Sequence, residues 1–119
     1  MSASVLLVDD DPAFRRLARR MLTAAGLAVV GEADSVGTAI LEARRLRPDS
    51  ALVDVGLPDG DGITLAGELA ALPWRPWIIL TSTDADAAGP EDLLRCGAGG
   101  FVPKADLPTV ALQRLLVRE

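Results

Sequence analysis

Aspartate side chains follow two of the apolar runs in this sequence. Asp9 and Asp10 come directly after the run Ser4–Val8. Asp54 lies near the end of a second run, Ala51–Val55. If the fold brings these carboxylates together, they repel one another unless a cation joins them. The chain has no histidine and a single cysteine, so such a site would use oxygen ligands, which select Mg²⁺ or Mn²⁺ over Zn²⁺.

Each aspartate also has a simpler interpretation. An aspartate run at the start of a helix is typical of an N-cap, and Asp11, followed by Pro12, is interpreted only as that cap. Asp54 by itself is typical of a turn. Beside a metal-binding pair, its carboxylate would be a third metal ligand, or a nucleophile that attacks a phosphoryl group and forms an acyl phosphate. A cation there would neutralise both the carboxylates and the phosphoryl oxygens.

A hydroxyl group and an ammonium group occur at two further strand ends. Thr81 follows the run Trp77–Leu80, and its hydroxyl would donate to a phosphoryl oxygen, although β-branched residues are common in strands for conformational reasons alone. Lys104 is the only lysine among 12 basic residues and follows the segment Phe101–Pro103. This placement favours a buried ion pair with Asp54 over an exposed surface lysine. Phe101 is typical of a core residue.

The elements that must position these side chains alternate along the chain. Short apolar runs predict strands at Ser4–Val8, Leu27–Gly31, Ala51–Val55, Trp77–Leu80 and Gly100–Val102. Helical periods predict helices from Pro12 to Gly26, from Asp34 or Ser35 to Pro48, over Ile63–Leu72, from Pro90 to Gly97, and from just after Asp106. This alternation predicts an α/β fold, a parallel sheet with helices on both faces. Ligands bind such a sheet at the carboxyl ends of its strands, where the polar residues lie.

Two of the predicted helices have a distinct apolar face. The first is expected to bury Phe14, Leu17, Ala18, Met21 and Leu22, with arginines on its other face. The last is expected to bury Ala111, Leu112, Leu115 and Leu116. These faces would pack on the sheet and give the domain its core.

Length and composition restrict the function further. The chain has 119 residues, half of them apolar, and this fits one domain, residues 1–119. The net charge of −5 argues against nucleic acid as a direct partner. Cys96 alone forms no internal disulfide, which fits a reducing compartment, and the sequence has neither a membrane-spanning apolar run nor a secretory signal. We therefore expect a cytoplasmic protein with no membrane partner.

Four motifs in order carry a family resemblance that spans the whole chain. They are VDDDP (Val8–Pro12), VDVGLPDGDG (Val53–Gly62), LTS (Leu80–Ser82) and FVPKADL (Phe101–Leu107). With this spacing the chain resembles the receiver domain of two-component response regulators, of the short single-domain type. The resemblance implies a flavodoxin-like fold, a doubly wound five-stranded parallel sheet in the order 2-1-3-4-5 with five helices.

The resemblance also implies a phosphorelay chemistry. Asp54 would accept a phosphoryl group from a phosphohistidine on a sensor histidine kinase or a histidine phosphotransfer protein. Asp9, Asp10, Asp54 and the backbone carbonyl of Gly56 would bind Mg²⁺, with Mn²⁺ as a substitute. Lys104 would pair with a phosphoryl oxygen. Such a domain is a phosphoacceptor that catalyses only its own phosphorylation and dephosphorylation, and is not otherwise an enzyme.

A conformational switch is part of the same resemblance. Thr81 would move toward the phosphoryl group, and Phe101 would turn inward into the space that the threonine leaves. This coupling would change a surface formed by helix four, strand five and helix five, through which the protein binds an unknown downstream protein or forms a dimer. Because the last predicted helix reaches the end of the sequence, we expect a stand-alone receiver.

Three departures from the family pattern bear on that switch. Phe101 replaces the more common tyrosine, which removes a hydroxyl and keeps the ring. The segment Thr83–Gly89 has a loop-like composition, so the fourth helix should be short and the signalling surface altered. Ala105 follows the lysine where the family often has a proline.

Other interpretations of the sequence remain open at this point. An aspartate-nucleophile phosphatase would need a DxDxT-type run after strand one, where this chain has Pro12 and Ala13. A flavodoxin would need a Ser/Thr-rich phosphate loop there, and three aspartates would repel a phosphate. A phosphorylation-independent interaction scaffold and a receiver fragment of a larger DNA-binding transcriptional regulator are the two alternatives within the same fold.

Overall fold

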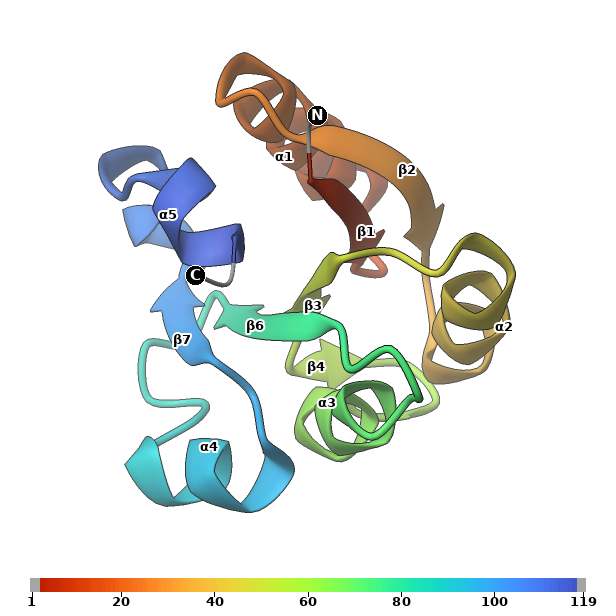
Figure 1. The fold of residues 1–119 in the computed structure, drawn as a ribbon. Coiled ribbons are helices and arrows are strands. Elements are labelled where there is room, and N and C mark those ends of the chain that lie inside the picture. Colours follow the sequence, from red (N-terminus) through yellow and green to blue (C-terminus); the bar gives the residue numbers. More distant parts are fainter. Residues whose placement is uncertain (1–2, 118–119) are drawn as a thin grey trace.

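The five apolar runs form one parallel sheet in the computed structural model, which describes residues 3–117. The strands are β1 (Ser4–Val8), β2 (Ala28–Ala33), β3 (Ser50–Asp54), β6 (Trp77–Ser82) and β7 (Gly100–Pro103). Their spatial order is β2-β1-β3-β6-β7, with every neighbouring pair parallel (Figure 1). This order confirms the predicted flavodoxin-like arrangement. The second strand continues two residues further than predicted, to Ala33.

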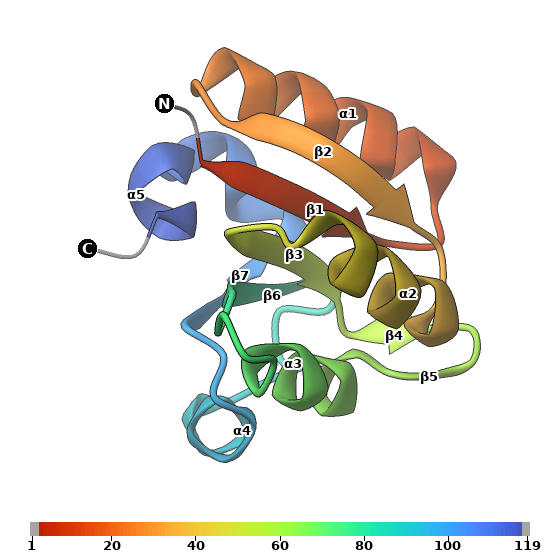
Figure 2. The ribbon, with the colours of Figure 1, turned by 45° about the vertical axis from the view of Figure 1, so that its right-hand side comes forward.

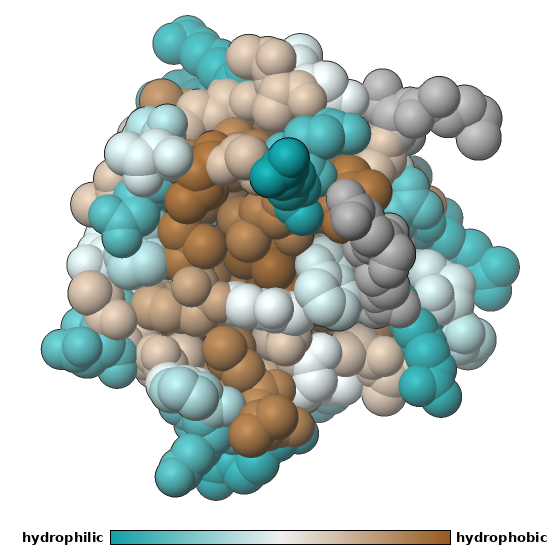
Figure 3. Space-filling model, turned by 60° about the vertical axis from the view of Figure 1, so that its left-hand side comes forward, coloured by the Kyte–Doolittle hydropathy of each residue, from teal (hydrophilic) through white to brown (hydrophobic). Residues whose placement is uncertain are grey.

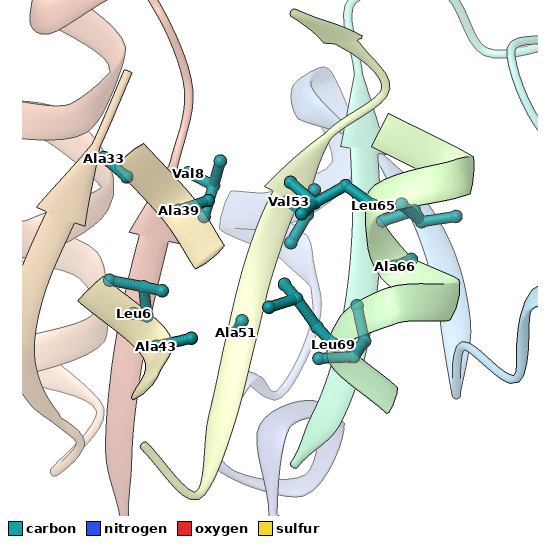
Figure 4. Packing of buried hydrophobic residues seen from close by; sticks show 12 residues of the cluster. Leu6, Val8, Ala33, Ala39, Ala43, Ala51, Val53, Leu65, Ala66 and Leu69 are labelled. Atoms are coloured by element: carbon teal, nitrogen blue, oxygen red, sulfur yellow. The ribbon is translucent and has the colours of Figure 1, made fainter. Parts of the chain in front are cut away.

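Alternating side chains of the strands build a core on each face of the sheet. Val5 and Leu7 of β1 face one way, toward α1 (Pro12–Ala24) and α5 (Leu112–Leu116). Leu6 and Val8 face the other way (Figure 4), toward α2 (Val36–Leu46) and α3 (Gly62–Ala70), the two helices that cover this face of the sheet in Figure 2. Both layers are fully buried, so the central strands are apolar throughout and their polar residues are confined to the ends.

A small hairpin follows β3, within the motif Val53–Gly62. Its strands are β4 (Gly56–Leu57) and β5 (Gly60–Asp61). Asp59 at its tip accepts hydrogen bonds from the first two backbone N–H groups of α2, at 2.7 and 3.1 Å, and these bonds lower the pKa of Asp59. Asp61 caps α3 by accepting from the N–H of Ile63. The hairpin is thus fixed at its tip and at its end.

The first helix turns one predicted core residue outward. Ala18 and Leu22 are buried as expected, whereas Leu17 is 50% exposed. Each residue of a helix is rotated by about 100° from the one before. Leu17 therefore lies at the edge of the apolar stripe and faces away from Ala18. The prediction for Leu17 was wrong.

The end of the chain also differs from the prediction. Residues Lys104–Thr109 form a 3-10 helix, η1, and the last α-helix begins only at Leu112 and leaves Ala111 exposed. The backbone is extended at Val110 and Ala111, so it separates η1 from α5 and no α-helix runs on from Asp106. Within residues 3–117 no helix has both the length and the apolar character needed to cross a membrane.

The predicted short fourth helix is confirmed. α4 spans Pro90–Cys96 and ends at Gly97, whose φ is 77°. Every residue of α4 is half-buried or exposed, and Leu94 is 85% exposed. Figure 3 turns the side of the molecule with α4, β7 and α5 toward the viewer, and apolar surface lies at its centre between hydrophilic rims.

Two alanine substitutions in α3 should shift stability in opposite directions. A Cβ at Gly62 would overlap the backbone carbonyl of Asp54 and lie 2.7 Å from the Cα of Val55, so Gly62→Ala should lower the free energy of unfolding by about 3 kcal/mol. A Cβ at Gly67 meets Cys96 at an ordinary 3.7–3.9 Å, so Gly67→Ala should raise it by up to about 1 kcal/mol. Urea unfolding measures both, and equal shifts would contradict the close approach at Gly62.

Candidate functional site

Three carboxylates meet at the carboxyl ends of two neighbouring strands. Asp9 and Asp10 follow β1, and Asp54 is the last residue of β3, which pairs directly with β1. One oxygen from each of the three lies within 4.8 Å of the others. Asp9 is 2% exposed and Asp54 is 7% exposed, whereas Asp10 faces solvent. The apolar strands thus place two aspartates where water screens their charges poorly.

Lys104 is the cation of this cluster. Its Nζ lies 2.7 Å from Oδ2 of Asp9 and 3.6 Å from Oδ2 of Asp54, and its side chain is 13% exposed. The ion pair predicted with Asp54 is present, and the contact with Asp9 is the closer one. Lys104 is the first residue of η1, directly after β7, so the end of the fifth parallel strand determines where the lysine side chain enters.

A single ammonium group does not balance three carboxylates. Burial raises the pKa of Asp54 above its ordinary value, and the charge of Asp9 raises it further. Lys104 and a 3.3 Å hydrogen bond from the N–H of Gly56 to Asp54 Oδ1 act in the opposite direction and do not cancel the effect. The site therefore has excess negative charge that a cation would relieve.

The donor atoms fit a divalent cation that prefers oxygen. Oδ1 of Asp9 accepts a hydrogen bond from the N–H of Asp11, while the buried Oδ2 has no hydrogen-bond partner within residues 3–117 and meets only the Lys104 ammonium. Asp10 and Asp54 complete a set of three carboxylates. Gly56 lies beside them, because its N–H bonds to Asp54. This donor set is the chemistry that Mg²⁺ and Mn²⁺ take.

The predicted switch residues lie between the cluster and the edge of the sheet. Thr81 on β6 is directly opposite Asp54 in the register and is 1% exposed. Its hydroxyl donates a 2.7 Å hydrogen bond to the carbonyl of Val102 on β7, away from Asp54. Phe101, next to Val102, is half-buried and packs on the core that α2 and α3 cover. A hydrogen bond thus links the site to the edge strand.

Two residues near the site were not found from the sequence. Arg15, expected on the outer face of α1, donates from Nη1 to the carbonyl of Asp9 at 2.6 Å and pairs with Glu32 at 2.9 Å. Phe14, expected only in the core, places its ring centroid 4.2 Å from the Nζ of Lys104. Helical spacing assigns a face to each residue, but it does not show how far a side chain reaches beyond the helix. No signal in the sequence identifies these contacts.

The comparison with known families supports a relation over nearly the whole chain. The sequence model of the response regulator receiver domain matches residues 5–115. The DNA-binding transcriptional activator DevR/DosR of Mycobacterium tuberculosis is 43% identical over 112 residues, which cover 92% of this chain and 51% of that protein. The chemotaxis protein CheY of Thermotoga maritima is 29% identical, over 97% of this chain and 96% of that protein.

Solved structures show the same arrangement. A two-component response regulator of the LuxR family from Aurantimonas sp. SI85-9A1 superposes with a TM-score of 0.85 and 30% identity, over 95% of this chain and 81% of that one. Several curated relatives are longer proteins: the chain spans between 27% and 51% of the length of four of them.

Replacing Asp54 by asparagine should stabilise the fold at neutral pH when no divalent cation is present. The pKa of Asp54 is raised in the folded state, so this group's contribution to stability is present below its unfolded value, near 3.8, and is lost as the pH rises through the folded value. The difference in unfolding free energy between Asp54→Asn and wild type should therefore grow from acidic to neutral pH. Urea unfolding in chelator across that range measures it.

With Mg²⁺ present, wild type should become more stable than Asp54→Asn. A concentration about 100 times the dissociation constant would stabilise wild type by about 2.7 kcal/mol, and Asp54→Asn by less, because one ligand loses its charge. The exposed Asp86→Asn should follow wild type in both media. An Asp54→Asn variant that is less stable than wild type in chelator would contradict the excess negative charge at the site.

Proposed function

The chain belongs to the response regulator receiver domain family, and from this premise we propose that it accepts a phosphoryl group on Asp54 from a phosphohistidine of a two-component system. The observation that carries the proposal is the buried Asp54 beside Lys104 and two further carboxylates. The chain has no histidine, so the donor imidazole must belong to a partner. We propose a sensor histidine kinase or a histidine phosphotransfer protein.

The proposed reaction is a displacement at phosphorus. A carboxylate oxygen of Asp54 attacks, a P–O bond forms, and the P–N bond to the donor imidazole breaks, with its electron pair going to the imidazole nitrogen. Lys104 is near enough to Asp54, at 3.6 Å, to pair with a phosphoryl oxygen. Asp9, Asp10, Asp54 and the carbonyl of Gly56 would hold Mg²⁺, or Mn²⁺ in its place, which when bound would neutralise charge on the carboxylates and phosphoryl oxygens.

The proposed output is a change at the edge of the sheet. The Thr81 hydroxyl would leave the Val102 carbonyl and donate to a phosphoryl oxygen, and the half-buried ring of Phe101 would turn toward the vacated space. These movements would alter the apolar face over α4, β7 and α5 seen in Figure 3. We propose that a downstream protein, or a second copy of the chain, binds this face.

The longer relatives have different names and therefore different activities as whole proteins. Some are named protein-glutamate methylesterase, and this chain covers 27% of the length of one of them. Our proposal for this chain is a phosphoacceptor that acts on no separate substrate. Its net charge of −5 favours protein partners over nucleic acid, and we propose a cytoplasmic location with no membrane partner.

Phosphorylation of Asp54 is tested most directly by intact mass. Incubation with acetyl phosphate and Mg²⁺ should add one phosphoryl group to wild type and to the exposed Asp86→Asn, and none to Asp54→Asn, because only the last variant lacks the proposed acceptor carboxylate beside Lys104. Chelator should prevent the gain. A beryllofluoride titration covers the case of a very short-lived phosphate. If wild type shows no mass gain and binds no beryllofluoride, the phosphoacceptor proposal fails and the phosphorylation-independent scaffold is the remaining alternative.

The switch is tested by replacing Thr81 with valine, which keeps the shape and removes the hydroxyl. The Val102 carbonyl loses its 2.7 Å hydrogen bond, so the free energy of unfolding should fall by about 1 kcal/mol. Beryllofluoride should still bind, but the amide NMR shifts of Phe101 and Val102 should change far less than in wild type. Thr64→Val, at an exposed position, is the control. Wild-type shift changes in Thr81→Val would contradict the proposed coupling.

A further inference from the structure

The ammonium group of Lys104 is held from more than one side. Asp9 lies 2.7 Å from Nζ and Asp54 lies 3.6 Å from it. The ring of Phe14 faces the same nitrogen, with its centroid at 4.2 Å. This distance is well within the range of a cation–π interaction, in which the negative face of the ring attracts the cation. The lysine side chain is 13% exposed, so water weakens this attraction little.

The ring is carried by a rigid element that also contacts the segment bearing the lysine. Phe14 lies in the first turn of α1, where Asp11 caps the helix by accepting from the N–H of Ala13 at 2.9 Å. It packs on the core layer that includes Ala18 of α1 and the fully buried Leu107 of η1. The helix with the ring and the segment with the lysine thus meet in one packed layer.

A lysine side chain needs such support in order to hold one position. Its four-carbon stem is flexible, and its ammonium group is a point charge without the fixed geometry of a guanidinium. Asp9 is the closer carboxylate and by itself would draw the ammonium away from Asp54. A third contact, from the ring of Phe14, limits that freedom. Groups that the fold already holds in place need not reorganise when charge develops in the transition state.

We propose that Phe14 is a positioning residue for Lys104. The face of its ring keeps the ammonium group beside Asp54, so that the lysine is in place to pair with the phosphoryl oxygens of an incoming donor. This inference rests on the proposed function of Asp54 as a phosphoacceptor. The ring touches neither Asp54 nor the phosphoryl group in this role and acts only through the lysine.

The contact itself is tested by NMR, because Lys104 is the only lysine and selective labelling gives a single side-chain signal set. In wild type the ring current should shift the ε-methylene protons upfield, and Phe14→Leu should remove that shift. Phe14→Tyr keeps the ring and should retain it. Met21→Leu, on the same helix and against the same core layer, is the packing control and should also retain it. An unchanged lysine signal in Phe14→Leu would overturn the proposal.

The functional consequence is tested by the rate of phosphoryl uptake from acetyl phosphate with Mg²⁺. Phe14→Leu should slow uptake and weaken beryllofluoride binding by about three- to tenfold, while Phe14→Tyr should stay within about twofold of wild type. In a Lys104→Ala background, Phe14→Leu should have no further effect, because the ring acts through the lysine. A purely structural role would give the same loss in both backgrounds and would overturn the proposal.

The outcomes separate this inference from the function on which it rests. If wild type takes up no phosphoryl group and binds no beryllofluoride, the proposed function fails, and the role of Phe14 fails with it. If wild type is active and Phe14→Leu is equally fast, only the positioning role fails.

Discussion

The contact between Lys104 and the buried carboxylates of Asp9 and Asp54 is the interaction on which the site depends. Each carboxylate is costly to bury alone, and the two repel each other across the gap between β1 and β3. One ammonium group reduces that cost without removing it, since Asp54 keeps a raised pKa. The remaining excess of negative charge is compatible with a divalent cation at this cluster.

Packing in the rest of the fold offsets the free-energy cost of burying these charged groups. Both faces of the central strands are buried, and α1 with α5 and α2 with α3 enclose them. Polar residues are therefore confined to the strand ends, where β1, β3 and β6 bring Asp9, Asp54 and Thr81 to one edge. Because β6 and β7 are direct neighbours, the hydrogen bond from Thr81 to Val102 joins this edge to an outer surface across a single strand spacing.

The sequence was most informative where residue type and strand position decide the outcome. Asp9, Asp54, Thr81 and Lys104 could be placed because carboxyl ends of parallel strands share one edge. The predictions for Leu17 and for the start of the last helix were wrong, since an apolar pattern does not show where the edge of a buried stripe falls or that Val110 and Ala111 take an extended backbone. The contacts of Phe14 and Arg15 could not be predicted, because they depend on how far side chains reach between elements.

The hairpin after β3 has a consequence for how a cation is received. Asp59 attaches its tip to the start of α2, and Asp61 ends it as the cap of α3. A free loop of this kind would lose conformational entropy on closing around an ion, on the order of 1–2 kcal/mol for each residue ordered. Here the hairpin loses that conformational entropy when the protein folds, before any ion binds. An ion that binds beside Gly56 would then meet a loop already ordered by folding, so the ordering of this loop would take little from its binding affinity.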